Sequence, residues 1–136
     1  MNVVTTLDYS ILAGAAYFST RAAINRFPIH QDWSELIDDR TLNERSGFEA
    51  LAFQSGNQIV LSYSGTDPAA SWNSGDWQTN FALLNGNWAD QLLQASEYYL
   101  QSKAANPGQS VTFTLTGHSL GGGLAALVGV FFNVRQ

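Results

Sequence analysis

A glycine-dense segment between a strand pattern and a helix pattern constrains the fold of this chain more than any other feature. Residues 111–116 are rich in β-branched and aromatic side chains, which is typical of a strand. Residues 124–132 are apolar on nearly all sides and predict a buried helix. The join between them, residues 117–123, carries Gly-x-Ser-x-Gly followed by two more glycines. A strand that turns at once into a buried helix indicates α/β layering.

Hydrophobic periodicity along the rest of the chain predicts elements that fit this architecture. Thr5 and Asp8 have the capping-box pattern of a helix start. The expected elements are a helix over 6–24, an irregular segment over 29–46 with one helical turn at 33–37, hairpin strands over 48–53 and 59–63, a long loop over 67–80, and a helix over 88–104. This order predicts that strands 58–63 and 111–116 are parallel neighbours in one sheet.

Composition narrows the class of protein. A chain of 136 residues makes about one domain, and its formal net charge of -5 with only six Lys and Arg argues against nucleic-acid binding. No apolar run is long enough for a transmembrane span. The absence of Cys excludes disulfides, thiolate zinc sites and cysteine nucleophiles. No Lys or Arg precedes the apolar run 11–16, so we expect no N-terminal signal peptide, and the localisation stays undetermined.

The Gly-x-Ser-x-Gly segment has the residue types of a nucleophile elbow, a sharp turn that projects a serine hydroxyl free of its own backbone. Gly117 and Gly121 then lie where the strand and helix backbones approach closely and a Cβ would clash. Ser119 is the candidate nucleophile. The N–H of Leu120, at the start of the following helix, can stabilise an oxyanion. The alternative is a plain strand-to-helix turn that uses its glycines only for packing.

Two blocks of the sequence resemble the class 3 (fungal-type) triacylglycerol lipases of the α/β-hydrolase superfamily. Residues 117–122, Gly-His-Ser-Leu-Gly-Gly, look like the GHSLGG elbow of that family. Residues 59–67 resemble its oxyanion strand, with Ser64 where an Arg is common. Trp77 followed by Asn80 is similar to the tryptophan-bearing lid that comes next. The N-terminal helix and the helix before the elbow also fall in the family's order, so the resemblance spans most of the chain.

The resemblance implies a serine ester hydrolase that acts on acyl esters of lipids at a lipid–water interface, with no metal or organic cofactor. Ser119 would attack the ester carbonyl, and the N–H groups of Thr66 and Leu120 would hold the oxyanion. Thr66 has the alternative of an ordinary turn threonine. The loop that carries Trp72 and Trp77 would be a lid, or else a surface loop anchored by its tryptophans.

The acid and base of the expected triad do not appear after the candidate nucleophile. In this superfamily they follow the serine, but residues 120–136 contain no Asp, Glu or His. His118 is the neighbour of Ser119, and side chains of adjacent residues in such a turn point apart. We expect His30 to be an ordinary surface or packing histidine. The carboxylates that precede Ser119 are expected to be turn or helix-start residues: Asp67, Asp76 and Asp90.

We therefore expect residues 1–136 to be the N-terminal part of a single hydrolase domain, a partial α/β-hydrolase sheet truncated after the elbow helix. Such a part would leave an unpaired sheet edge and apolar surface, and it would self-associate. Two other readings stay open: a non-catalytic relic that binds lipid or a partner, and a thioesterase or acyltransferase that uses the same elbow.

Overall fold

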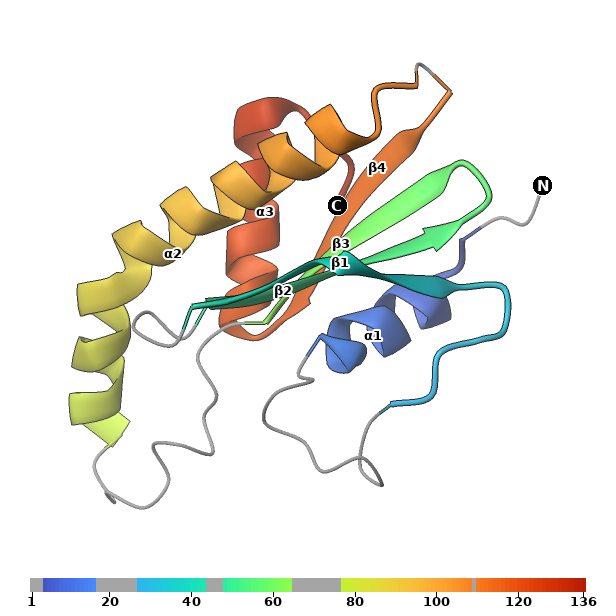
Figure 1. Cartoon of the computed structure of the whole chain (residues 1–136). Coiled ribbons are helices and arrows are strands. Elements are labelled where there is room, and N and C mark those ends of the chain that lie inside the picture. The colour runs from blue at the N-terminus through green and yellow to red at the C-terminus, as the bar shows by residue number, and fades with distance from the viewer. Residues whose placement is uncertain (1–3, 17–26, 44–47, 65–76, 109) are drawn as a thin grey trace.

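A four-stranded sheet lies between one helix on one face and two helices on the other (Figure 1). The computed structural model describes residues 4–16, 27–43, 48–64, 77–108 and 110–136. Its elements are α1 (Thr6–Ala15), β1 (Ser34–Asn43), β2 (Phe48–Ser55), β3 (Gln58–Ser64), α2 (Trp77–Ala105), β4 (Thr112–His118) and α3 (Leu120–Phe132). This is the α/β layering expected from the order of the sequence patterns.

The sheet has the order β1-β2-β3-β4 and mixes two kinds of pairing. β1 with β2 and β2 with β3 are antiparallel, and Gly56 takes a φ of 59° in the tight turn of the second hairpin. β3 and β4 are parallel, as predicted, and their register aligns Gln58 with Thr112 and Ser64 with His118. The carboxyl ends of both strands therefore meet at one edge of the sheet, the edge at which Ser119 follows β4.

Side chains alternate across the sheet and build a core on each face. On the α2 and α3 face, the core contains Phe48, Ala50, Ala52, Ile59, Leu61, Tyr63, Ala95, Tyr98, Tyr99, Leu115, Leu124, Ala125 and Val128. On the α1 face, it contains Leu12, Trp33, Leu51, Phe53 and Val60. The Tyr63 hydroxyl donates to the backbone O of Ala95 at 2.9 Å, and burial raises the pKa of Tyr63 far above its usual value. This bond ties α2 to the centre of the sheet.

The segment expected to be irregular contains a strand. Residues 34–43 form β1 on the edge of the described sheet, so the expected helical turn at 33–37 is wrong. The sequence of this strand is largely polar and charged, so it lacks the hydrophobic alternation by which strands are predicted. Charged side chains are common in edge strands. Pairing with β2 supplies its backbone hydrogen bonds, and the register shifts between Leu36 and Thr41.

Three helix boundaries differ from those expected. α1 ends at Ala15, and residues 17–26 lie outside the described part. α2 begins at Trp77 rather than at 88, so it takes the last residues of the expected loop at 67–80. Residues 79–87 include three Asn and one Gly, which have low helix propensity, so the sequence did not predict these turns. α3 begins at Leu120 rather than 124, because its glycines form the first turn instead of a separate loop.

Candidate active site

One residue joins β4 to α3. β4 ends at His118 and α3 begins at Leu120, so Ser119 alone makes the reversal. A nucleophile elbow predicts a positive φ for its serine. The backbone of Ser119 has a φ of 56° and a ψ of -122°, which confirms this prediction. This conformation is strained for a residue with a side chain, and such strain persists only where the surroundings impose it. The turn has the sharp strand-to-helix form of a nucleophile elbow.

The Ser119 hydroxyl does not cap the helix that it precedes. Serine at an N-cap ordinarily accepts a hydrogen bond from the first turn, as Thr5 does at the start of α1. There the Thr5 hydroxyl accepts from the N–H of Asp8 at 3.2 Å, with an extended backbone at φ -93°. Ser119 makes no side-chain capping bond, and it is exposed. With this strained backbone, the hydroxyl is not engaged by the first turn of its own helix.

The amino end of α3 directly follows Ser119. The carbonyl O of Ser119 accepts hydrogen bonds from the N–H groups of Gly122 at 3.0 Å and Gly123 at 3.3 Å. The N–H of Leu120, at the first helical position, has no acceptor within the helix, because the first N–H groups of an α-helix never do. It also lies at the positive end of the helix dipole. Leu120 can therefore donate to negative charge that develops beside Ser119.

Close backbone contact between the strand and the helix explains the glycines. A Cβ on Gly117 would overlap the carbonyl group of Gly121 and lie 2.7 Å from the N of Gly122. A Cβ on Gly122 would lie 3.1 Å from the carbonyl O of Gly117. The elbow thus requires Gly117, whose carbonyl and Cα face the first turn of α3 with no room for a side chain.

Trp88 is a residue of this region that the sequence patterns did not single out. It belongs to α2, is half-buried, and packs against the larger core. A Cβ on Gly123 would lie 3.3 Å from Cη2 of its ring. The third glycine of the run therefore makes room for an indole rather than for backbone. A tryptophan in the helix preceding a triple glycine is the only signal in the sequence that pointed to this contact.

Helix α1 supports the elbow strand from the other face of the sheet. The Thr116 hydroxyl donates to the backbone O of Tyr9 at 3.4 Å, and the buried Ser62 hydroxyl donates to that of Leu12 at 2.9 Å. Both carbonyls belong to α1, so polar side chains of β3 and β4 bond to the helix backbone. The carboxyl end of β4 is thereby held between α1 and α3.

A sequence model of the phospholipase-like family described as the Tle-like phospholipase domain matches residues 18–135. The chain belongs to this family. It is 35% identical over 91 residues to an extracellular phospholipase A1 of Serratia liquefaciens, a match that covers 66% of this chain and 26% of that enzyme. The chain thus spans about a quarter of the length of this curated relative.

Solved lipase structures share the fold of this phospholipase-like domain. A lipase from Rhizopus microsporus var. chinensis superposes with a TM-score of 0.60 at 15% identity, over 93% of this chain and 50% of that one. Lipase II from Rhizopus niveus superposes with a TM-score of 0.57 at 18% identity, over 93% and 53%. The partial α/β-hydrolase fold is confirmed, and with it the lipase-type resemblance. Membership of class 3 itself stays a prediction.

Several expected site residues of the phospholipase-like domain lie outside the described part. Thr66 and Trp72 belong to residues 65–76, and Trp77 begins α2 with a side chain that is not described. β3 ends at Ser64, whose register partner is His118. The last residue of β3 therefore lies beside the elbow, and Thr66 follows it by two positions in the sequence. The oxyanion role of Thr66 and the lid role of the tryptophans stay predictions.

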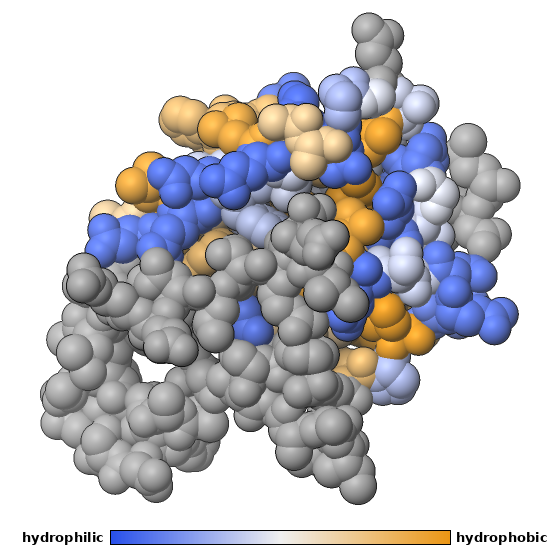
Figure 2. Space-filling view, in the orientation of Figure 1, coloured by the Kyte–Doolittle hydropathy of each residue, from blue (hydrophilic) through white to orange (hydrophobic). Residues whose placement is uncertain are grey.

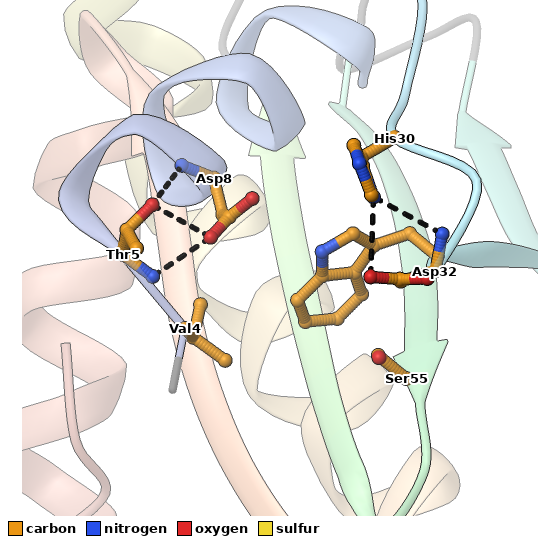
Figure 3. Close-up of a pocket in the computed structure, with 7 residues that line it drawn as sticks. Val4, Thr5, Asp8, His30, Asp32 and Ser55 are labelled. Carbon is orange, nitrogen blue, oxygen red and sulfur yellow. Dashed lines mark hydrogen bonds and ion pairs between the residues drawn. The ribbon is translucent and has the colours of Figure 1, made fainter. Parts of the chain in front are cut away.

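His30 lies beside Asp32 in the part of the structure drawn in Figure 3. It lines a pocket of about 250 Å³ together with Val4, Thr5, Asp8, Asp32, Trp33 and Ser55. Ser55 ends β2 opposite Gln58, which pairs with Thr112 at the beginning of β4. Ser119 follows the far end of that strand, roughly 20 Å away at the usual rise per residue. His30 is therefore not placed to serve as the base of Ser119.

The pocket holds its polar groups in local hydrogen bonds. Nδ1 of His30 lies 3.3 Å from a carboxylate oxygen of Asp32 and accepts from the Asp32 N–H at 3.3 Å. Hydrogen bonds from Thr5 hold the pKa of Asp8 below its usual value.

In the described ranges, no three His, Asp or Glu side chains are arranged to hold a metal ion. No helix in these ranges has the length and apolarity to cross a bilayer.

Proposed function

We propose that this domain carries the nucleophile of a serine ester hydrolase that cleaves acyl esters of phospholipids. The observation that carries the proposal is the geometry of Ser119, a strained N-cap residue whose hydroxyl leaves its own helix uncapped. The family match and the Serratia phospholipase A1 support phospholipids as the substrate class. An elbow of this form, between a parallel strand and a helix, suits acyl transfer to a serine.

In the proposed reaction, Ser119 Oγ attacks the ester carbonyl and loses its proton to a histidine. The carbonyl oxygen becomes an oxyanion, which accepts hydrogen bonds from the N–H groups of Leu120 and Thr66. The tetrahedral intermediate expels the lysophospholipid alkoxide, which takes the proton from the histidine, and leaves an acyl group on Ser119. Water then attacks this acyl ester by the same steps and releases the fatty acid.

The histidine and its acidic partner belong, in this proposal, to a part of the hydrolase outside residues 1–136. The chain contains two histidines, of which His30 lines the pocket of Ser55 at the far end of the sheet and His118 adjoins the nucleophile on the same strand end. Because the chain spans half of each Rhizopus lipase, its relatives have further sequence in which both residues can lie.

The test joins residues 1–136 to the portion of the Serratia enzyme that follows its matched segment. Fatty acid released from phosphatidylcholine vesicles is measured for this chimera and its Ser119→Ala variant. We expect the substitution to lower the rate about 10³-fold or more, because the nucleophile is lost. Ser110→Ala, at another exposed serine of the chain, is the matched control and leaves the rate unchanged.

Mass spectrometry of the quenched reaction should find the acyl group on Ser119. Hydrolysis that survives Ser119→Ala would refute the serine mechanism. A chimera that is folded but cleaves neither oxygen esters nor thioesters would support the non-catalytic relic, and a preference for acyl thioesters would support a thioesterase.

A further inference from the structure

The first turn of α3 has little stability of its own. Three consecutive glycines occupy it, Gly121, Gly122 and Gly123, and glycine is a poor helix former because its backbone loses the most conformational freedom. Ser119 makes no side-chain capping bond, and the turn holds no acidic residue that would interact with the helix dipole. The position of this turn, and of the Leu120 N–H at its start, is therefore set by contacts with other elements.

Two elements contact this turn, each at a different glycine. From β4, the backbone of Gly117 approaches so closely that its Cβ would overlap the carbonyl group of Gly121. From α2, Cη2 of the Trp88 indole lies 3.3 Å from the position that a Cβ on Gly123 would take. The N–H of Gly123 also donates to the backbone O of Ser119 at 3.3 Å. The indole thus packs on the residue whose hydrogen bond holds the carbonyl group of the strained serine.

Trp88 belongs to the core-facing side of α2. The outer surface of this helix carries many hydrophilic residues in the space-filling view (Figure 2), and Asp90 is among its exposed residues. Trp88, by contrast, is half-buried and packs against the larger core. Two turns further along α2, the backbone O of Ala95 accepts a hydrogen bond from the buried Tyr63 hydroxyl. The helix that brings the indole to Gly123 is therefore tied to the centre of the sheet.

We propose that Trp88 is a positioning residue for the nucleophile and the oxyanion donor. Its indole holds the first turn of α3 against β4, and so fixes where Ser119 and the Leu120 N–H lie. The roles of these two groups rest on the proposed function, whereas the packing of Trp88 on the turn does not. A displacement of about 1 Å at reacting groups can slow the chemical step about a hundredfold. A positioning role therefore predicts a loss in kcat with little change in KM.

The first experiment requires no catalysis. Hydrogen exchange of the chain is followed at single amides by NMR for the parent and for Trp88→Leu. We expect the Gly123 N–H to exchange about tenfold faster or more in the variant, because the turn opens more readily without the indole. The Leu115 N–H, which donates to the backbone O of Arg135 at 2.9 Å, is the internal control and should change little. Phe113→Leu, at another half-buried aromatic of the same core, is the matched control variant and should leave Gly123 exchange unchanged.

The second experiment measures kcat and KM of the chimera with a soluble short-chain ester. Trp88→Leu should lower kcat about tenfold or more and change KM less than about twofold, since the reacting groups are misplaced but the substrate still binds. Phe113→Leu, near the beginning of β4 and away from the elbow, should leave both constants unchanged. Urea unfolding of the same proteins checks that each is folded under the assay conditions.

An exchange of bulk between Trp88 and Gly123 tests their contact directly. A methyl group on Gly123 has to displace the indole, so Gly123→Ala in the parent chimera should lower kcat. Trp88→Phe removes Cη2 from this position, and the same methyl group then fills part of the gap. Gly123→Ala should therefore raise the kcat of the Trp88→Phe variant. Opposite effects of one substitution in two backgrounds are the coupling expected of residues that share a space.

Unchanged Gly123 exchange in Trp88→Leu, or the same effect of Gly123→Ala in both backgrounds, would overturn the proposal. So would a higher KM at unchanged kcat, which would make Trp88 a substrate-binding residue. A loss of kcat shared by Phe113→Leu would also overturn it, because the cause would be general weakening of the core. Failure of the proposed function is separate: a parent chimera without serine-dependent hydrolysis would refute the hydrolase, while the exchange experiment still decides whether Trp88 holds the turn.

Discussion

The Cβ that Gly117 lacks would overlap the carbonyl group of Gly121, at the point where β4 meets the first turn of α3. This contact joins backbone to backbone, so neither side can move away as a flexible side chain could. The position of Ser119 between these two glycines depends on it.

Gly117→Ala should destabilise the domain by about 1–3 kcal/mol, the usual cost of overpacking a tight contact. The added methyl group has to push α3 away from β4, which also displaces Ser119. Urea unfolding measures the free energy, and the chimera with the Serratia portion measures activity. Gly108→Ala is the control, since its Cβ would lie at an ordinary 3.4 Å from Val111 Cγ2. Equal stability of both variants would contradict the close approach.

Ser119→Gly should raise the free energy of unfolding by about 1 kcal/mol, because glycine adopts a positive φ without strain but costs some chain entropy. The same change abolishes serine-dependent hydrolysis in the chimera. Asn133→Gly is the matched control at a φ of 55°, where asparagine is already tolerated, and its gain should be smaller. A Ser119→Gly variant less stable than the parent would show that the turn is unstrained.

Residues 1–136 alone should hydrolyse a soluble activated ester no faster than their own Ser119→Ala variant. Oxyanion stabilisation by Leu120 can leave some rate above that of water, but little of it depends on a hydroxyl without a base. A spectrophotometric assay of both proteins measures the difference. Turnover by the chain that requires Ser119 would mean that a base for this serine lies within these residues.

The capping box of α1 should make stability depend on pH in the acid range. Hydrogen bonds from Thr5 lower the pKa of Asp8 from 3.8, so its stabilisation is complete above that value. It is lost as the pH falls through the lower folded-state pKa. Asp8→Asn should cost about 1 kcal/mol at neutral pH, and this cost should disappear in strong acid. Thermal unfolding across pH 2–7 compares the two proteins, with Asp90→Asn as an exposed control.

Replacement of Trp72 and Trp77 by Ser tests the expected lid. In the chimera, we expect a far larger loss of activity on phospholipid vesicles than on a soluble short-chain ester, because a lid matters at the lipid surface. Tryptophan fluorescence should also change when vesicles are added to the parent chimera. Equal losses on the two substrates would mean that these tryptophans only support the fold.

Local sequence determined the elements of this domain whose signals lie within a few residues. The capping box at Thr5, the hairpin turn at Gly56, and the elbow at Ser119 all follow from residues that contact one another along the chain. The positive φ of Ser119 was predictable for the same reason, since a strand that turns at once into a helix leaves one residue to reverse the backbone.

Only the tertiary structure decided features that depend on distant partners. β1 exists because β2 offers its polar residues a hydrogen-bonded edge, and Gly123 makes room for Trp88 of another helix. The pocket of His30 includes Ser55, which the register of the sheet places at the opposite end from Ser119. Arg135 joins β4 because Asn133 ends α3 in a left-handed conformation. Sequence patterns report local backbone preferences, whereas these relationships arise from packing between segments far apart in the chain.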